Sequence, residues 1–378
     1  MIPIRTVFIR LIKKIIKYSF KLLPAKNTLV FESEGDYSDN CYAFYKYLVD
    51  NNYNQKYKLV WFVTDPSLYS KHVTKNVAFV KKFGSVGFYY YLNTAKYIFF
   101  THPYWLTSWK KTQTVINFWH GVILKHMKSD QHMLYNYLVI SSDNLIDVFC
   151  ENFLLKNNQC LVLGTPRLDL LFSKKNIVIN GIDICNYKKV FLCMPTFKKT
   201  KNWIDSYEDN CFYINTINSL ESLKALNSKL KDNNCFMIVK IHHLQLMDSI
   251  KSDNLSNIVY LTDDDLLNNG IQLYELLACS DALLTDFSSV YFDYLLLNNQ
   301  IGFFANSIKE YSRGFLVDNP QEYMPGQKIY NNLDLYSFID NVVNNNDNYS
   351  IERKRVLDSV DQFQDSMNCE RIAKYFGL

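Results

Sequence analysis

Four short clusters of polar residues, each directly after an apolar run, carry the side chains best suited to chemistry. The first is Trp119-His120-Gly121, with Lys125 and Asp130 downstream. Imidazole titrates near neutral pH, so His120 is a candidate general base, and Gly121 lets the chain turn sharply after it. A histidine that only hydrogen-bonds a neighbouring loop is the plainer alternative, and taken alone it is the more common case.

The second cluster, residues 164–169, combines turn-forming residues with an acid and a base. It reads Gly-Thr-Pro-Arg-Leu-Asp, so Arg167 and Asp169 can pair within the turn. A guanidinium group also matches the geometry of a phosphate. A structural role and a ligand-binding role both stay open.

The third cluster is divided between residues 194–198 and residues 240–243. Together the two segments supply hydroxyl, ammonium and imidazole groups to a pocket, and Lys198, Lys240 and His242 are the candidates for contact with an anionic ligand. His242 and His243 are adjacent, so they are expected to point in different directions from the end of a strand.

The fourth cluster is the most informative, because the apolar run 282–285 leads into an acid, two serines and an amphipathic segment. The hydroxyls of Ser288 and Ser289, with the first N–H groups and positive dipole end of a following helix, would form an anion site. Thr285 can add a third hydroxyl. Alternatively, Asp286 or Ser288 only caps the helix, and the two roles are compatible.

Several other kinds of site are disfavoured. The sequence has no Walker loop, GxGxxG fingerprint or GxSxG elbow. It also lacks an HExxH-like pair and a carboxylate-rich magnesium signature, so we expect no cofactor and no metal, while a loosely bound divalent ion stays open. The nine cysteines are odd in number and scattered, without a CxxC pair. This pattern predicts reduced, mostly buried thiols in a cytosolic protein.

The elements that position these clusters are predicted by short apolar runs that alternate with helical patterns, which is typical of parallel α/β domains. The predicted strands are 28–31, 58–64, 97–100, 115–118, 137–140, 161–163, 190–194, 236–241, 258–260, 282–285 and 301–304. The predicted helices include 42–51, 86–93, 211–230 and 290–298.

A polar stretch, residues 173–188, separates two such series. The sequence therefore predicts α/β domains over 27–172 and 187–350, with a helix over 351–378 that packs back on the first. Two doubly wound, Rossmann-type halves facing a cleft form the GT-B type of fold, with ligands at the carboxyl ends of the strands.

Residues 1–26 form a basic amphipathic segment with seven Lys or Arg and no acid. The basic residues recur at steps of three and four opposite an apolar stripe, which suits the surface of an anionic membrane leaflet. They interrupt the stripe too often for a membrane span, and a secretory signal pattern is missing. We therefore expect a cytoplasmic protein, peripheral at the inner face of the cell membrane. An ordinary helix packed on its own domain is the alternative.

The remainder of the chain is slightly acidic. Subtracting the seven charges of residues 1–26 from the net charge of +4 leaves −3. This charge does not fit a nucleic-acid-binding body.

Taken in order, the clusters resemble the CDP-glycerol:poly(glycerophosphate) glycerophosphotransferase family, which includes teichoic-acid primases and polymerases. The family's Trp-His-Gly and following lysine are similar to 119–121 and Lys125, and its Gly-x-Pro-Arg-x-Asp is similar to 164–169. Its Pro-Thr-aromatic-Arg, Lys-x-His-Pro and Thr-Asp-Tyr-Ser-Ser blocks resemble 195–198, 240–243 and 285–289. Residues 37–40, Asp293 and Pro325-Gly326 also look familial, so the likeness spans residues 28–330.

Three residues depart from the family pattern. Lys198 replaces arginine, His243 replaces proline and Phe287 replaces tyrosine. The lysine keeps the charge but loses the bidentate fork. These changes bear on how the donor is held more than on the class of reaction.

The resemblance implies transfer of a polyol phosphate, glycerol phosphate or ribitol phosphate, from a CDP-activated donor to a lipid-linked or polymeric cell-surface glycan, in teichoic-acid or capsule synthesis, with release of CMP. His120 would take the acceptor's proton, and His242 would hold or protonate the phosphoryl oxygens. The implied donor-binding residues are Thr285, Ser288, Ser289, Lys198, Lys240, Arg313 and, at the ribose, Glu275. On the acceptor side, Gly121, Lys125, Asp130, Arg167 and Asp169 would bind or shape the site.

Two other functions stay open. One is a GT-B glycosyltransferase that uses a CMP- or UDP-sugar, as capsule polymerases do. The other is a non-catalytic protein of the membrane surface with a degenerate nucleotide pocket.

Overall fold

The computed structural model describes residues 19–102, 109–122, 135–173, 175–195, 212–241, 255–305 and 319–378, together with the backbone of 199–200 and 203–204. The chain divides into two compact units. The first takes the chain up to His120, the stretch that ends at Asp169, and Asp365–Leu378. The second takes Leu170–Gln364 and the residues directly after His120. The chain thus passes between units at 169–170, just before the predicted boundary.

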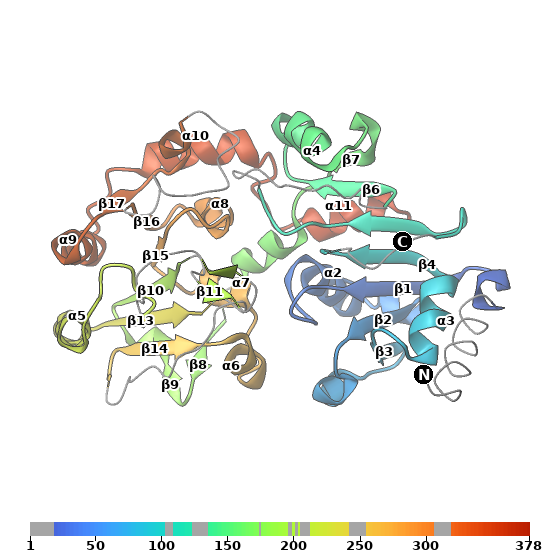
Figure 1. Cartoon of the computed structure of the whole chain (residues 1–378), viewed down its shortest axis with the longest axis horizontal. Helices are drawn as coiled ribbons and strands as arrows, with labels where there is room; N and C mark the ends of the chain where they lie inside the picture. Colours follow the sequence, from blue (N-terminus) through green and yellow to red (C-terminus); the bar gives the residue numbers. More distant parts are fainter. Residues whose placement is uncertain are drawn as a thin grey trace, which may run out of the picture. The chain divides into compact units, whose positions relative to one another are not determined.

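The first unit is built on a seven-stranded parallel sheet with the strand order β3-β2-β1-β4-β5-β6-β7 (Figure 1). Its strands are β1 (Lys26–Glu32), β2 (Lys58–Val63), β3 (Val77–Lys81), β4 (Ala95–Phe100), β5 (Thr114–Asn117), β6 (Tyr137–Ile140) and β7 (Cys160–Val162). Its helices are α2 (Asp39–Asp50), α3 (Val86–Thr94), α4 (Ile146–Phe153) and α11 (Asn368–Tyr375). The order reverses between β1 and β4, as in doubly wound folds.

The second unit repeats this arrangement in six parallel strands, in the order β14-β13-β10-β15-β16-β17. The strands are β10 (Lys189–Met194), β13 (Cys235–Lys240), β14 (Ile258–Leu261), β15 (Ala282–Thr285), β16 (Gln300–Phe304) and β17 (Gln327–Ile329). The helices are α5 (Leu220–Asp232), α6 (Asp263–Asn268), α7 (Leu273–Ala278), α8 (Val290–Tyr294), α9 (Asn332–Val343) and α10 (Ser350–Val360). Two short hairpins accompany them, β8 (Val178–Ile179) with β9 (Ile182–Asp183) and β11 (Lys199–Thr200) with β12 (Trp203–Ile204). Here the order reverses between β10 and β15. The prediction of two doubly wound α/β units is confirmed.

The strands were readable from the sequence because parallel strands are buried on both faces and so appear as unbroken apolar runs. In β1, Leu29, Val30 and Phe31 are fully buried, and the Phe31 ring stacks on Phe99 of β4 at 5.5 Å. The sequence did not predict β3 and β17. Both are edge strands with a single buried residue each, Val77 and Ile329, so they lack that signal.

Two helices differ from their predicted bounds. The helix expected from residue 211 begins instead at Leu220, because the Ser219 hydroxyl accepts a hydrogen bond from Ser222 N at 3.1 Å and caps it. The helix expected over 290–298 is a short α8 followed by a 3₁₀ turn, Leu295–Leu297. The dipole available at the start of α8 is correspondingly smaller than predicted.

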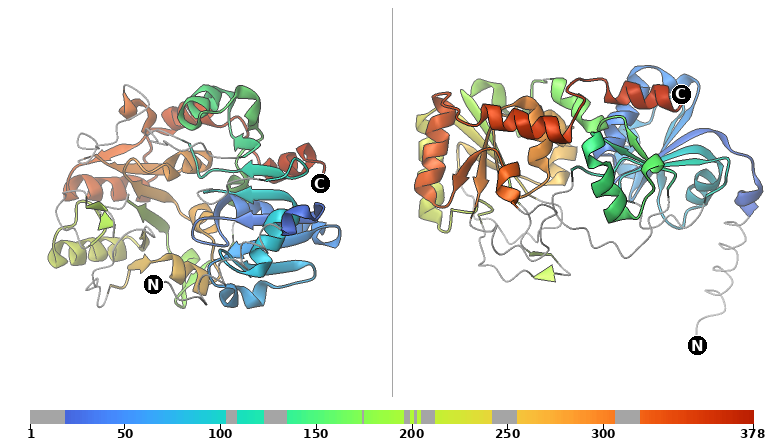
Figure 2. Two further views of the ribbon diagram at one scale, coloured as in Figure 1. Left: turned by 45° about the vertical axis from the view of Figure 1, so that its right-hand side comes forward. Right: turned by 90° about the horizontal axis from the view of Figure 1, so that it is seen from above.

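The segment expected as one C-terminal helix contains two, α10 in the second unit and α11 in the first. The Tyr97 hydroxyl of β4 donates a hydrogen bond of 2.8 Å to the Phe376 carbonyl. The Phe376 ring also packs on Tyr97 and Phe99. Figure 2 shows α11, drawn in red, lying among the blue and cyan elements of the first unit.

Within the described residues, no helix is both long and apolar enough to cross a membrane. Eight of the nine cysteines belong to the described part of the chain, and all eight are free thiols, five of them buried.

A buried arginine fixes α10 in the second unit. Arg353 is fully buried, and its guanidinium group donates to the Asp347 carboxylate and to the Asn298 carbonyl and side-chain oxygens. Burial pushes the pKa of Asp347 up, but the hydrogen bonds from Arg353 outweigh it and hold the pKa below its ordinary value. The stabilisation is therefore present above the unfolded-state pKa of Asp347 and is lost as pH falls through the folded-state value.

We expect Arg353→Ala to lower the free energy of unfolding by about 2–3 kcal/mol, because it empties a fully buried position and removes the hydrogen bonds to Asp347 and Asn298. Lys354→Ala, at the exposed next position, should change it by no more than about 0.5 kcal/mol. Urea denaturation at neutral pH measures both values. Equal effects in the two variants would contradict this account.

Candidate active site

The predicted polar clusters fall at the carboxyl ends of the central strands, where ligands bind in doubly wound sheets. In the first unit, Glu34 follows β1, Thr101 follows β4 and His120 follows β5. In the second, Thr285 ends β15 and leads to Ser288 and Ser289. Each unit therefore carries its chemical groups at or next to its own topological switch point.

His120 follows a strained turn. Trp119 has a φ of +51°, a left-handed conformation that bulky residues rarely adopt, and Gly121 has a φ of +131°. Trp119 N donates to the Asn117 side-chain oxygen at 2.8 Å, and the indole packs edge-on against Phe153 at 4.5 Å. This turn aims the His120 side chain away from the end of β5.

Asn40, at the start of α2, holds this turn from one side. It is fully buried, and its amide nitrogen donates to the Trp119 carbonyl at 2.8 Å and the Phe118 carbonyl at 3.3 Å. Its amide oxygen accepts from Arg167 N at 3.0 Å. One side chain thus joins the turn before His120 to the turn that contains Arg167.

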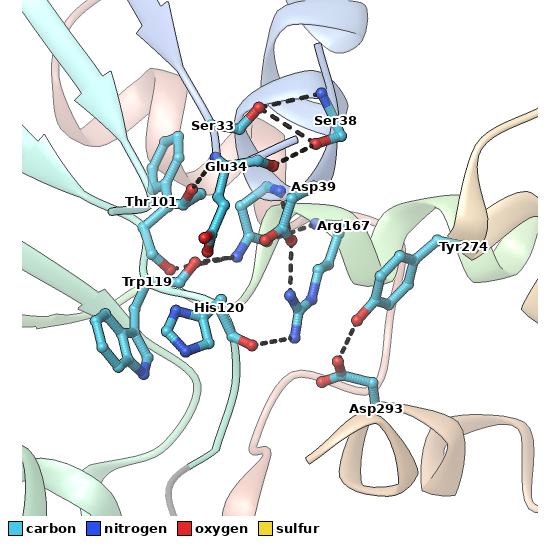
Figure 3. Close-up of polar contacts among 12 residues, drawn as sticks. Ser33, Glu34, Ser38, Asp39, Thr101, Trp119, His120, Arg167, Tyr274 and Asp293 are labelled. Atoms are coloured by element: carbon cyan, nitrogen blue, oxygen red, sulfur yellow. Dashed lines mark hydrogen bonds and ion pairs between the residues drawn. The ribbon is translucent and has the colours of Figure 1, made fainter. Parts of the chain in front are cut away.

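Arg167 holds the same turn from the other side. Its guanidinium group donates to the Asp39 carboxylate at 2.6 Å and to the His120 carbonyl at 2.9 Å (Figure 3). Arg167 is buried, and Asp39 supplies its counter-charge. The structural role left open by the sequence is therefore the one observed.

The predicted ion pair between Arg167 and Asp169 is wrong. Asp169 instead accepts hydrogen bonds from the backbone N–H groups of Asn368 at 3.0 Å and Cys369 at 2.8 Å, at the start of α11. The two side chains belong to one short 3₁₀ segment, Pro166–Phe172, but serve different elements. Their partners are distant in sequence, so the local pattern did not reveal them.

The environment of His120 keeps its imidazole neutral. Burial, followed by the nearby His102 and Arg167, lowers the pKa of His120 well below its ordinary value, and Glu34 opposes the shift. The Nδ1 atom is buried without a hydrogen-bond partner, although the residue as a whole is partly exposed. A neutral imidazole can accept a proton at the ring nitrogen that does not carry the hydrogen.

In the second unit, Thr285 connects the two strands between which the strand order reverses. Its hydroxyl donates to the Met194 carbonyl at 2.7 Å, which ties the end of β15 to the end of β10. Thr285 is fully buried, and its role at a ligand stays a prediction. Asp286 is also buried and accepts from Ser288 N at 3.1 Å. This contact closes the turn before α8 and does not cap the helix, because the N-cap is Ser289.

Ser288 and Ser289 are both partly exposed. Ser289 stands at the N-cap of α8, and its side chain makes no capping hydrogen bond. Both serines are thus less enclosed than Thr285 and Asp286, and their contact with an anionic ligand stays a prediction.

Two further predicted donor residues are engaged within the second unit. Lys240 is buried, donates to the Ile241 carbonyl at 2.7 Å and pairs with Asp263 at 2.8 Å. Glu275 is buried, forms an ion pair with Lys175 and accepts from Gln272 N at 3.3 Å, which caps α7. In this arrangement both side chains stabilise the unit, and their binding roles stay predictions.

A buried pair joins α7 to α8. The Tyr274 hydroxyl donates to the Asp293 carboxylate (Figure 3), and both residues are buried. Asp293 thus fixes the helix that follows the two serines.

Five predicted site residues, Lys125, Asp130, Lys198, His242 and Arg313, lie outside the described residues. Among the residues that are described, no group of three or more His, Cys, Asp or Glu side chains could hold a metal ion. The expectation that the protein needs no metal stays a prediction.

Three residues that the structure brings to this site, Asn40, Glu34 and His102, were assigned no role from the sequence. Asn40 was noted only for its resemblance to a family motif. Glu34 and His102 directly follow the ends of the central strands β1 and β4. The rule that polar residues after parallel strands form the site would have selected both.

We expect Asn40→Ala to lower the free energy of unfolding by about 2–3 kcal/mol, since it leaves buried carbonyl and N–H groups unpaired. Asn51→Ala, at the exposed C-cap of the same helix, removes one hydrogen bond to Tyr47 O and should cost less than about 1 kcal/mol. Chemical denaturation distinguishes the two. A loss for Asn40→Ala no larger than that of the control would contradict the bridging role.

Comparison with known proteins gives a consistent result. The sequence profile described as CDP-Glycerol:Poly(glycerophosphate) glycerophosphotransferase matches residues 15–376. A teichoic acid glycerol-phosphate transferase of Staphylococcus aureus is 28% identical, over 88% of this chain and 91% of that protein. A teichoic acid poly(glycerol phosphate) polymerase of Bacillus spizizenii is 28% identical, over 79% of each chain.

Solved structures agree on the fold. A variant of the wall teichoic acid polymerase TagF superposes with a TM-score of 0.75 at 22% identity, covering 99% of this chain and 95% of that chain. This similarity and the two doubly wound units confirm the predicted GT-B-like fold. Because the family profile matches nearly the whole sequence, the chain belongs to the CDP-glycerol:poly(glycerophosphate) glycerophosphotransferase family.

Proposed function

We propose that this enzyme transfers glycerol phosphate from CDP-glycerol to a hydroxyl group of a teichoic-acid-type glycan acceptor and releases CMP. Membership of the glycerophosphotransferase family establishes the class of reaction. The observation that carries the residue assignment is the position of His120 on a strained turn after a central strand, where Asn40 and Arg167 hold the backbone on either side of it. Burial lowers the pKa of His120, which favours the unprotonated imidazole that can accept a proton.

The choice of glycerol phosphate over ribitol phosphate follows the more similar relatives. Those at 28% identity carry glycerol phosphate in their names. A Staphylococcus aureus protein named as a teichoic acid ribitol-phosphate polymerase is 23% identical over 93% of this chain. Ribitol phosphate is therefore the second choice for the same site.

In the proposed reaction His120 accepts the proton of the acceptor hydroxyl. The acceptor oxygen then forms a bond to the donor's β-phosphorus, which carries the glycerol, and the bond from that phosphorus to the bridging oxygen breaks. CMP leaves with the electron pair of that bond. Phosphoryl transfer depends mainly on alignment and charge stabilisation, so the protein need not form a covalent intermediate.

The second unit is proposed to hold the donor's diphosphate through the hydroxyls of Ser288 and Ser289. Their partial exposure supports this role, as does their place after the central strand β15. We assign Lys198 and Arg313 to neutralise the phosphates, and His242 to hold the transferred phosphoryl oxygens. Cations and preorganised donors at these oxygens stabilise the charge that develops in the transition state.

We further propose that residues 1–26 dock the enzyme on the inner face of the cell membrane, where a lipid-linked acceptor would lie. This proposal is supported by the charge of the segment, which contains seven basic residues and no acidic residue. In addition, Leu22 exposes 88% of its surface to solvent. An apolar residue so exposed beside lysines fits an interfacial segment.

The two alternatives from the sequence now have less support. Transfer of a CMP- or UDP-sugar would retain the fold, but it would not account for a match to a glycerophosphotransferase profile over residues 15–376. A protein without catalytic activity would not need the hydrogen bonds that keep His120 on a strained turn.

The direct test of the substrate is a donor screen with CDP-glycerol, CDP-ribitol and CMP-sialic acid. We expect CMP release with CDP-glycerol, and mass analysis should show the acceptor heavier by glycerol phosphate units. Turnover with CMP-sialic acid alone would reject the proposal.

For His120→Ala we expect kcat to fall by about 10²–10⁴-fold, the usual contribution of a general base. CDP-glycerol should bind as tightly as to the unchanged enzyme, which calorimetry can measure. His72→Ala, a substitution of a partly exposed histidine in the same unit, serves as control and should keep activity. Retained turnover in His120→Ala would remove His120 from the mechanism.

Because the pKa of His120 is held well below its ordinary value, His120 stays unprotonated as pH falls toward neutrality. We expect kcat/KM to show no loss attributable to this group between about pH 8 and pH 6. A steep decline centred near pH 6.5 that disappears in a His120 variant would contradict the assignment.

Deletion of residues 1–26 should lower activity on a lipid-linked acceptor in vesicles more than on a soluble analogue of that acceptor. The physical reason is the loss of membrane attraction, worth about 1 kcal/mol per basic residue near an anionic surface. Comparing the two activity ratios removes any general effect of truncation. Equal losses on both acceptors would oppose the docking role.

A further inference from the structure

A second histidine packs face to face on His120. The His102 ring lies 4.2 Å from the His120 ring, centroid to centroid, and the two planes differ by only 10°. Trp119 also contacts the His120 ring, with centroids 3.9 Å apart. The plane of the imidazole is therefore set by its neighbours as well as by the strained turn.

The position of His102 is itself determined by two groups at the switch point. Its Nε2 atom lies 3.0 Å from the Glu34 carboxylate, and its Nδ1 atom lies 3.0 Å from the Thr101 hydroxyl. Glu34 N in turn donates to the Thr101 hydroxyl oxygen at 3.3 Å (Figure 3). Glu34 follows β1 and Thr101 follows β4, the two strands between which the order of the sheet reverses.

These contacts fix the ring of His102 in one plane. Nε2 carries the hydrogen that is donated to the Glu34 carboxylate. Nδ1 contacts the Thr101 hydroxyl, and the tautomer of His102 sets which of the two atoms donates in that contact.

We propose that Glu34 and His102 form a positioning pair for His120, in which Glu34 orients the His102 ring and the stacked rings hold His120 ready to accept the acceptor's proton. This inference rests on the proposed role of His120 as the base. Neither residue needs to touch the substrate. The pair fixes the direction of the His120 ring, and Glu34 supplies a counter-charge.

The charged groups around His120 explain why a counter-charge is needed. Arg167 and His102 both disfavour a positive charge on the ring, as does burial, whereas Glu34 favours it. Asp39 is already paired with Arg167. When His120 takes up a proton, the carboxylate of Glu34 helps to offset the new charge, next to the ring of His102.

The test uses the full-length enzyme and three single variants, Glu34→Gln, His102→Phe and His102→Ala. Glu34→Gln removes the charge at a side chain that is 44% exposed, so the fold should tolerate it. His102→Phe keeps a flat ring against His120 but loses both nitrogens. His102→Ala removes the ring. Thermal melting confirms that each variant folds.

We expect kcat to fall about tenfold in Glu34→Gln and in His102→Phe, and about 100-fold in His102→Ala. Misalignment of a catalytic group slows a reaction by factors of about this size. KM for CDP-glycerol should stay within about twofold, since neither residue is proposed to bind the donor. The double variant Glu34→Gln/His102→Phe should be no slower than His102→Phe alone, because Glu34 acts through His102. Additive losses, or an unchanged kcat in Glu34→Gln, would overturn the proposal.

A measurement that does not depend on catalytic turnover tests this proposal separately from the proposed function. NMR titration of ¹³C-labelled histidines follows the pKa of His120 directly. We expect the pKa to rise toward its ordinary value in His102→Phe, because a group that lowers it is removed. An unchanged pKa would overturn the pair even if the enzyme is active. Absence of CMP release by the unchanged enzyme would instead reject the proposed function, while this titration still decides whether the pair acts on His120.

Discussion

The hydrogen bonds from Asn40 and Arg167 to the turn at Trp119 are the interactions on which the catalytic assignment depends. A bulky residue in the left-handed region costs about 1–2 kcal/mol. Hydrogen bonds from a charged guanidinium group contribute about 1.5–3 kcal/mol each. The contacts from Arg167 and Asn40 to the carbonyls around Trp119 therefore outweigh the strain. Without them, the chain after β5 would relax and the imidazole would lose its direction.

The same topology appears twice, and each copy contributes a different kind of group. In the first sheet, the residues after the central strands include Glu34, His102 and His120, whose side chains can take up or release a proton. In the second they are hydroxyls braced by Thr285 and Asp286, suited to holding phosphate. A doubly wound sheet exposes these positions because its crossover connections diverge where the strand order reverses. Proton transfer and phosphate binding are thus assigned to separate units.

Burial governs which groups are available for chemistry. Thr285, Asp286, Lys240 and Glu275 are all buried, and each has a protein partner that it stabilises. His120, Ser288 and Ser289 are less enclosed. Burial around the His120 ring lowers its pKa and so keeps it in the proton-accepting form. A polar residue in a motif is therefore a candidate for ligand binding only if its polar atoms do not already form hydrogen bonds or ion pairs within the protein.

The sequence alone determined the buried strands, the fold class and the positions of His120 and Ser288-Ser289 after strands, because these depend on local signals, whereas the edge strands β3 and β17 lack such a signal. Buried parallel strands give apolar runs, and the polar residues directly after them mark the site. Only the tertiary structure decided the partners. Arg167 pairs with Asp39, 128 residues earlier, and Asp169 caps α11, about 200 residues later. His102 reaches His120 because β4 and β5 are neighbours in the sheet. Contacts between segments far apart in the chain leave no periodic or local pattern, so a single sequence does not reveal them.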